Sequence, residues 1–168
     1  MTAMLTADDR PEQALGGKCG RVVVGVDDTP GGLAALRWAV ELARSADMPL
    51  VAVRVWALGL PRHGGLRRRG DGHGHVVFTF RGAEPRREAI QLTKKAFRAA
   101  VGGIPPDLDV TIETPEGNPG PALTQLVSSC GDVLVVGTAS SHSLKRLLHG
   151  SVSAYCYSRL PGQVSVIR

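Results

Sequence analysis

The sequence predicts one α/β domain built on a parallel sheet with helices on both faces. Short Val-rich runs alternate with stretches whose apolar residues recur at helical spacing, a pattern typical of strands joined by crossover helices. The 168 residues suit about one domain, and a hydrophobic content of 43% is enough for its core. Aromatic residues are only 4% of the chain, so Val, Leu and Ala must fill that core, as in buried parallel sheets.

The first 20 residues mix small and charged side chains, without the apolar run of a signal peptide. We interpret residues 1–20 as a disordered lead-in to a domain that covers 21–168. No stretch elsewhere reaches the roughly 18 apolar residues that a membrane span needs. We therefore expect a cytoplasmic protein that does not enter a membrane.

The first part of the domain predicts a strand, a helix and a second strand. Arg21 to Asp28 (RVVVGVDD) is a Val-rich run ending in two acids, which is typical of a buried strand that leads into a loop. Leu50 to Ala57 (LVAVRVWA) is apolar on both faces apart from Arg54, so we expect a central strand. The helix between them is predicted over Pro30 to Asp47, with an apolar stripe of Leu33, Leu36, Trp38, Val40, Leu42 and Ala43.

The second part continues the alternation, which implies right-handed crossovers. A helix starts near Glu84 and stops at Gly102 and Gly103. Three later strands are predicted at Asp109–Thr114, Asp132–Gly137 and Gln163–Ile167. Between the first two of them lies a helix capped by Asn118–Pro119, with an apolar face of Leu123, Leu126, Val127 and Cys130. The last helix is opened by Gly150–Ser151, and its apolar face is Val152, Tyr155, Cys156 and Leu160.

A basic segment interrupts this pattern from Gly59 to Gly82, and we interpret it as an insertion. Its one apolar island, Val76 to Phe80, predicts either an extra edge strand or a packed loop. Residues 61–87 hold seven arginines against two acids, so this stretch carries the whole net charge of +5. Clustered charge in a flexible segment is usually solvated, so we do not expect nucleic acid as a partner, and polyanion binding stays an alternative.

Residues that often bind metals or catalyse reactions form no familiar motif. The three cysteines, Cys19, Cys130 and Cys156, lack C-x-x-C spacing, and we expect them to be reduced and mostly structural. No G-x-x-x-x-G-K-S/T loop, G-x-S-x-G elbow or H-E-x-x-H motif occurs, so three common enzyme classes lose their usual signatures. No metal site is expected at His63, His73 and His75, because their segment is rich in glycine.

Two loops are candidates for ligand binding, because open parallel sheets bind ligands outside the carboxyl ends of their strands. Asp27-Asp28-Thr29 follows the first predicted strand, and the stretch from Gly137 to Ser151 follows the fourth. In the second loop, glycines let backbone N–H groups approach phosphate oxygens, and the helix that begins near Gly150 points its N-terminus at them.

The segments VVVGVDDTPGGLAALRWAVELA and DVLVVGTASSHSLKRLLHGSVS resemble the universal stress protein family. The second is similar to the family's nucleotide loop, G-x2-G-x9-G-S/T, with Gly137, Gly150 and Ser151 at matching positions. The likeness covers Arg21 to Arg168 apart from 59–82. It implies a Rossmann-like sheet of five parallel strands in the order 3-2-1-4-5.

The resemblance also implies an adenine-nucleotide-binding protein of the stress response, with ATP as the ligand, Mg²⁺ as its companion ion, and unidentified protein partners. In this interpretation the main function is binding, and a bound nucleotide would alter the recognition of protein partners. ATP hydrolysis would be slow at most, and no catalytic residue is assigned. Asp27 would hydrogen-bond the nucleoside, and the backbone of Val55 would face the adenine. The other implied contacts are the pocket walls Gly25, Val136 and Val152 and the phosphate loop Gly137, Ser140, Gly150 and Ser151.

Two residues depart from the family pattern and support a second hypothesis. Ser140 replaces the second loop glycine, and in a left-handed conformation it would cost about 1 kcal/mol, or about fivefold to tenfold in affinity. Asp28 adds a carboxylate that would repel a triphosphate unless a metal ion bridges them. The alternative is a family member that has lost ATP binding and acts through dimerisation and protein partners.

The chain's last predicted strand favours a homodimer. Members of the family commonly pair their last strands, and QVSVI ends the chain with an apolar, exposed edge. The resemblance therefore implies a homodimer formed through the C-terminal strand.

Overall fold

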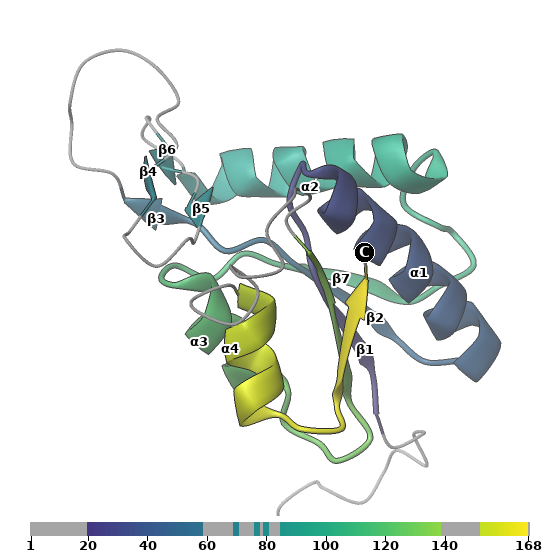
Figure 1. Cartoon of the computed structure of the whole chain (residues 1–168). Coiled ribbons are helices and arrows are strands. Elements are labelled where there is room, and N and C mark those ends of the chain that lie inside the picture. Colours follow the sequence, from purple (N-terminus) through teal and green to yellow (C-terminus); the bar gives the residue numbers. More distant parts are fainter. Residues whose placement is uncertain are drawn as a thin grey trace, which may run out of the picture.

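The computed structural model describes residues 20–58, 69–70, 76–77, 79–80, 85–138 and 152–167, and for those between 57 and 84 it describes the backbone alone. A five-stranded parallel sheet runs through its centre (Figure 1), and its strands lie in the order β7-β2-β1-β8-β9. These strands are the first to fifth expected ones, so the predicted order 3-2-1-4-5 is confirmed. Their bounds are β1 (Val22–Gly25), β2 (Leu50–Val53), β7 (Val110–Glu113), β8 (Val133–Gly137) and β9 (Val164–Ile167).

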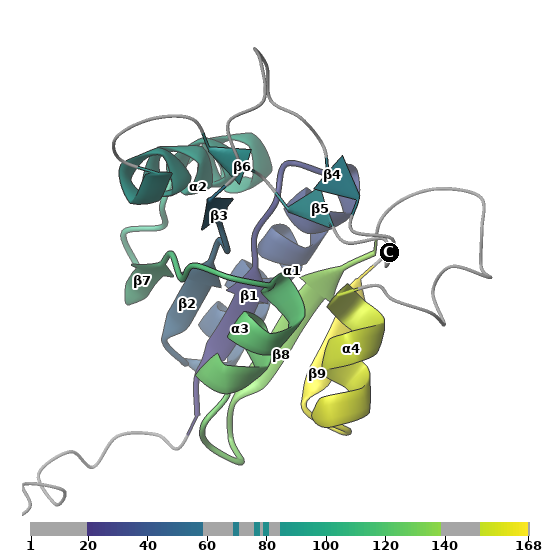
Figure 2. The same ribbon diagram turned by 90° about the vertical axis from the view of Figure 1, so that its left-hand side faces the viewer.

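Four helices cover the two faces of the sheet in the described part of the chain, as Figure 2 shows. Helices α1 (Pro30–Ala46) and α2 (Pro85–Val101) pack together on one face, and α3 (Pro119–Leu126) and α4 (Val152–Arg159) pack together on the other. The predicted α/β class with helices on both faces is confirmed.

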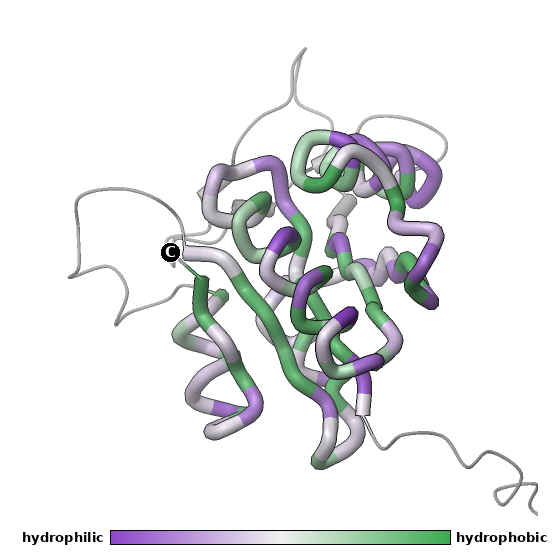
Figure 3. The backbone as a smooth tube through the Cα atoms, turned by 90° about the vertical axis from the view of Figure 1, so that its right-hand side faces the viewer, coloured by the Kyte–Doolittle hydropathy of each residue, from purple (hydrophilic) through white to green (hydrophobic). Residues whose placement is uncertain are grey.

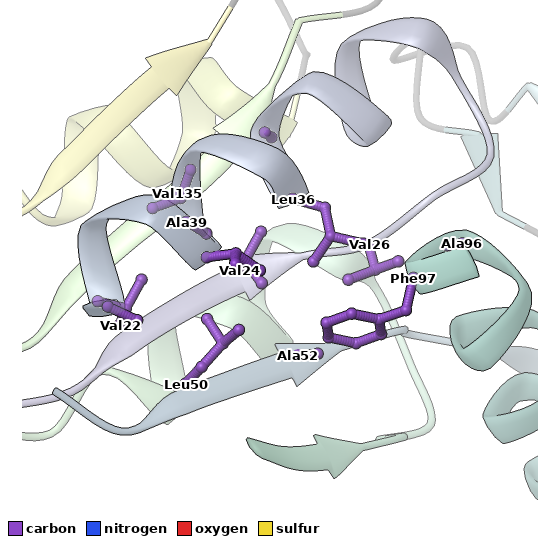
Figure 4. Close-up of a cluster of buried hydrophobic side chains, with 13 residues drawn as sticks. Val22, Val24, Val26, Leu36, Ala39, Leu50, Ala52, Ala96, Phe97 and Val135 are labelled. Atoms are coloured by element: carbon purple, nitrogen blue, oxygen red, sulfur yellow. The ribbon is translucent and has the colours of Figure 1, made fainter. Parts of the chain in front are cut away.

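The alternation of side chains along the strands supplies a core to each face. Val22 and Val24 of β1 point toward α1 and α2, where Leu36 and Phe97 meet them (Figure 4). Val23 points to the opposite face and joins a cluster with Leu123 and Cys156 from α3 and α4. The sheet is therefore buried on both sides, which is why its strands are Val-rich without polar alternation. Figure 3 shows the same contrast, with hydrophobic strands inside and helices of mixed hydropathy outside.

Residues at both ends of helix α1 account for where it begins and ends. The hydroxyl of Thr29 accepts a hydrogen bond from the Gly32 N–H (3.0 Å), and Pro30 occupies the first turn, where its missing N–H costs nothing. Asp47 ends the helix in the left-handed region at φ 52°. Trp38, expected in the buried stripe, is 39% exposed, because the helical spacing turns it away from the face that buries Leu36 and Val40.

Three further expectations need adjustment. The second strand ends at Val53, and beyond Trp56 the chain forms β3 (Ala57–Leu58) in a separate small sheet with β6 (Thr79–Phe80). The Val76–Phe80 island thus pairs outside the main sheet, since β5 (Val76–Val77) pairs with β4 (Arg69–Gly70). Cys130 is exposed and lies beyond the end of α3 at Leu126, so its predicted place on an apolar helix face is wrong.

A polar network joins β1 to β8 at the amino-terminal edge of the sheet. The side chain of Asp132 is 2% exposed, and its oxygens accept hydrogen bonds from the N–H groups of Arg21 (3.1 Å), Ser128 (3.0 Å) and Ser129 (3.2 Å). Burial by itself would raise the pKa of Asp132, but these N–H groups and the Arg21 guanidinium hold that pKa below its ordinary value. The network fixes β1 beside β8 at the edge opposite the candidate site.

Within the described residues, no helix is both long enough and apolar enough to span a bilayer.

Candidate functional site

The candidate site lies at the carboxyl ends of β1, β2 and β8, which share the upper edge of the sheet in Figure 2. From β1 the chain crosses to β2 on one side, while β8 pairs with β1 on the other. This is the point where the strand order reverses direction, and the loops leaving it diverge to opposite faces of the sheet. Ligands of open parallel sheets bind at such points.

Asp27 begins the loop between β1 and α1, and its carboxylate is fixed by one oxygen. Oδ1 accepts hydrogen bonds from the N–H (2.9 Å) and the hydroxyl (2.6 Å) of Thr29. A side chain at position 32 would overlap this same oxygen, so Gly32 leaves the space that Asp27 needs. Among the described residues Oδ2 has no hydrogen-bond donor. Asp27 is therefore held in place while one oxygen stays available as an acceptor.

Asp28, the next residue, forms an ion pair with Arg54 just beyond β2. Its Oδ1 lies 3.1 Å from Nη2 of Arg54 and its Oδ2 lies 3.4 Å from Nη1. The Arg54 side chain is only 1% exposed, whereas that of Asp28 is 42% exposed. The repulsion expected from Asp28 assumed an uncompensated carboxylate, and this carboxylate is paired with a cation.

The backbone of Val55 faces the gap that β1 leaves when it turns away at Asp27. The N–H groups of Arg54 and Trp56 bond to carbonyls of Glu113 and Pro115, on the β7 side. Backbone groups alternate along an extended chain, so the N–H and C=O of Val55 point the other way, toward β1. Within the described part of the chain they have no hydrogen-bond partner. One donor and one acceptor are thus presented side by side at the edge of the site.

Gly137, the last residue of β8, packs directly on the start of α1. A Cβ atom there would overlap the carbonyl group of Gly31 and lie 2.7 Å from the Gly32 nitrogen. A Cβ atom at Gly31 would in turn overlap the Thr138 carbonyl oxygen. This contact is a reason for glycine at position 137 that does not involve a phosphate. It also brings the loops after β1 and β8 together.

The residues expected as pocket walls come together on the α3 and α4 face of the sheet. Val55 and Val136 are buried in the same cluster, and Val152 at the start of α4 packs against it. Gly25 ends β1 between them, where an added Cβ would lie 3.2 Å from a methyl group of Leu123 and 3.6 Å from Val136. Four of the predicted residues are therefore neighbours on one apolar surface.

Three predicted phosphate-loop residues, Ser140, Gly150 and Ser151, lie outside the described residues. So do the basic and histidine residues of the same loop, Lys145, Arg146, His142 and His149. The same holds for the histidines of the basic segment. Among the residues that are described, no three acidic, Cys or His side chains converge as a metal site.

Sequence reasoning missed the roles of Arg54 and Thr29. Arg54 was noted only as an interruption of an apolar strand, yet a lone arginine there was a signal that a buried partner must exist. Thr29 was seen as part of a loop, although Thr before Pro at a helix start is a recognisable cap.

The sequence model of the universal stress protein family matches residues 19–168. No curated protein matches the chain in sequence.

Solved structures of universal stress proteins share the fold. The UspA protein from Lactobacillus plantarum is 20% identical, with 90% of this chain and 99% of that one covered and a TM-score of 0.55. A universal stress protein in complex with cAMP is 21% identical, with 89% and 97% covered and a TM-score of 0.57. One from Archaeoglobus fulgidus is 17% identical, with 88% and 98% covered and a TM-score of 0.55.

Proposed function

The chain belongs to the universal stress protein family, and from this premise we propose that it is an adenine-nucleotide-binding protein of the stress response, with ATP as its ligand. A related structure contains cAMP, which supports an adenine nucleotide as the class of ligand. Binding alters the recognition of protein partners, and hydrolysis of ATP is slow at most.

The observation that carries the proposal is the backbone of Val55, which has no hydrogen-bond partner among the described residues. An N–H and a C=O that point the same way match the edge of an adenine ring, which offers an acceptor ring nitrogen next to an amino group. Oδ2 of Asp27, to which no described residue donates, accepts a hydrogen bond from a ribose hydroxyl. The apolar surface of Gly25, Val136 and Val152 covers the sugar and base.

The phosphates extend from this point toward the loop that leaves Gly137 and the N-terminus of α4. Helix α4 begins at Val152, so its first N–H groups face the carboxyl edge of the sheet. Gly150, Ser151 and Ser140 contribute contacts in the proposal, and Mg²⁺ accompanies a bound triphosphate.

Isothermal titration with ATP, ADP, AMP and cAMP tests the proposal. We expect heat of binding with at least one of them, and no heat with any at millimolar concentration refutes it. That result would favour the alternative of a family member without ATP binding.

Asp27→Asn is the matched variant for this titration. The amide keeps the oxygen that holds Thr29 but replaces Oδ2 with a donor, so the loop stays in place while the ribose acceptor is lost. Loss of a hydrogen bond to a charged acceptor costs about 1.5–3 kcal/mol, so affinity falls about tenfold or more. An unchanged affinity would show that Asp27 does not contact the nucleoside.

Partner contacts include a second copy of this chain at β9. This strand is an edge of the main sheet and Val166 is 38% exposed. The carbonyls of Gln163 and Ile167 bond to β8, so the backbone groups of Val164 and Val166 point outward. An exposed apolar edge of this kind pairs readily with another strand.

A further inference from the structure

We propose that Arg54 is a specificity-determining residue, which neutralises Asp28 and thereby sets how many phosphate groups the site tolerates. The inference rests on the proposed function and deepens it. Without Arg54 the loop after β1 would present two adjacent carboxylates, Asp27 and Asp28, at the edge where a nucleotide enters. With Arg54 the second carboxylate belongs to a neutral pair.

The geometry supports a paired unit instead of a chance surface contact. Each guanidinium Nη atom donates to one carboxylate oxygen of Asp28, Nη2 to Oδ1 at 3.1 Å and Nη1 to Oδ2 at 3.4 Å, in a side-by-side arrangement. The backbone of Arg54 is anchored by its N–H to the Glu113 carbonyl at 3.0 Å. The backbone from which this side chain extends is therefore fixed at the sheet edge.

Burial makes the pair asymmetric. Arg54 is 1% exposed and needs an anion nearby, because a buried cation without a counter-charge is strongly unfavourable. Asp28 is 42% exposed, and water can solvate it if the arginine is removed. Removing Arg54 thus leaves a solvated negative charge at the entrance, whereas removing Asp28 leaves a buried positive one.

The effect on ligands depends on their charge. For charges separated by about 10 Å in a medium with a dielectric constant of about 40–80, each added phosphate charge changes affinity about twofold to fourfold at low salt. ATP carries about two more negative charges than AMP, so an unmasked Asp28 lowers ATP affinity about 4-fold to 16-fold more than AMP affinity. Adenosine is uncharged, so its affinity hardly changes when Asp28 is unmasked.

An Asp28 variant changes the local charge in the opposite direction. Asp28→Asn removes a negative charge and leaves that of Arg54, so ATP affinity should rise more than AMP affinity. Because Arg54 is buried, the same change should also destabilise the fold around it.

The test measures binding of adenosine, AMP, ADP and ATP by isothermal titration to four proteins: wild type, Arg54→Met, Arg54→Lys and the double variant Arg54→Met with Asp28→Asn. Arg54→Met should keep adenosine affinity within about twofold and show losses that increase from AMP to ATP, by about 4-fold to 16-fold between them. Arg54→Lys keeps a cation and should retain the wild-type ratio of ATP to adenosine affinity. The double variant should restore that ratio, because the unmasked carboxylate is gone.

Salt gives an independent readout. Raising ionic strength from about 0.05 M to about 0.5 M should shrink the graded loss in Arg54→Met, because exposed charges are screened. A merely structural role would instead lower the affinity for all four ligands equally, with no salt dependence and no restoration in the double variant. That outcome, or no loss at all, overturns the inference and leaves the proposed function standing. A wild-type protein that binds none of these four ligands and no cAMP refutes the proposed function itself, and the inference with it.

Discussion

Replacing Gly137 with alanine distinguishes packing from phosphate binding as the reason for glycine at the end of β8. The added Cβ would overlap the Gly31 carbonyl group and lie 2.7 Å from the Gly32 nitrogen, all backbone atoms of α1. A flexible side chain could turn aside, but a helix start packed on a sheet must shift as a unit. Overpacking of this kind costs about 1–3 kcal/mol, and rigid backbone neighbours place the cost near the upper end.

The measurement is urea unfolding of the ligand-free protein. We expect Gly137→Ala to lower the free energy of unfolding by about 3 kcal/mol. In a domain of this size that corresponds to a fall in Tm of about 6–12 °C. Binding of any nucleotide plays no part in this result.

Gly25→Ala is the matched control, since Gly25 also ends a central strand of the same sheet. Its Cβ would meet only side chains, with Leu123 at 3.2 Å as the nearest. Leu123 can adjust, so we expect a loss below about 1 kcal/mol. If Gly137→Ala costs no more than Gly25→Ala while nucleotide affinity falls, the packing argument is wrong and the phosphate explanation of Gly137 is right.

Three other predictions follow from described contacts. Asp132→Asn turns one of two acceptor oxygens into a donor that faces backbone N–H groups, and should cost about 1–3 kcal/mol of unfolding free energy at neutral pH. Because the pKa of Asp132 is lowered in the folded state, its carboxylate stabilises the fold fully above the ordinary carboxyl range, and this stabilisation is lost as the pH falls through the folded pKa. The difference in unfolding free energy between wild type and Asp132→Asn should therefore shrink from about pH 6 to about pH 3. A difference that stays constant over this range would contradict the prediction. Thr29→Val removes the cap of α1 and the hydroxyl that donates to Asp27, and should lower stability by about 1–2 kcal/mol, whereas Thr29→Ser keeps the hydroxyl and should not. Equal losses of the two variants in thermal melting would show that the hydroxyl is not the source of the stability. Val166→Pro removes an outward-pointing N–H from β9, so light scattering should report a monomer in place of the dimer, while the Tm of the monomer stays unchanged. A dimer that persists in this variant would show that the interface lies elsewhere.

The order and type of the elements could be predicted from local pattern. The Val-rich runs at β1 and β8 and the apolar spacing in α1 are properties of neighbouring residues, and hydrophobic burial acts on them in the same way in any α/β context. Asp27 and Gly137 could also be predicted as candidates, because parallel strands end at one edge. The strand order came from the family resemblance, since no local pattern contains it.

Boundaries and exposure were less predictable. Trp38 and Cys130 follow apolar patterns in the sequence, yet both are exposed, because packing of α1 on the sheet and the early end of α3 decide which residues are covered. A periodic pattern predicts which face of a helix is apolar, but it does not predict how much of that face is buried against neighbouring elements.

By itself the sequence determined the fold class, the family and the edge of the sheet where a ligand would lie. Only the tertiary structure decided the state of the residues at that edge. Asp28 and Arg54 become partners, and Gly31 and Gly137 touch, because the crossovers and the parallel register bring separate loops together. Contacts between residues far apart in the chain depend on that register, which no single segment specifies.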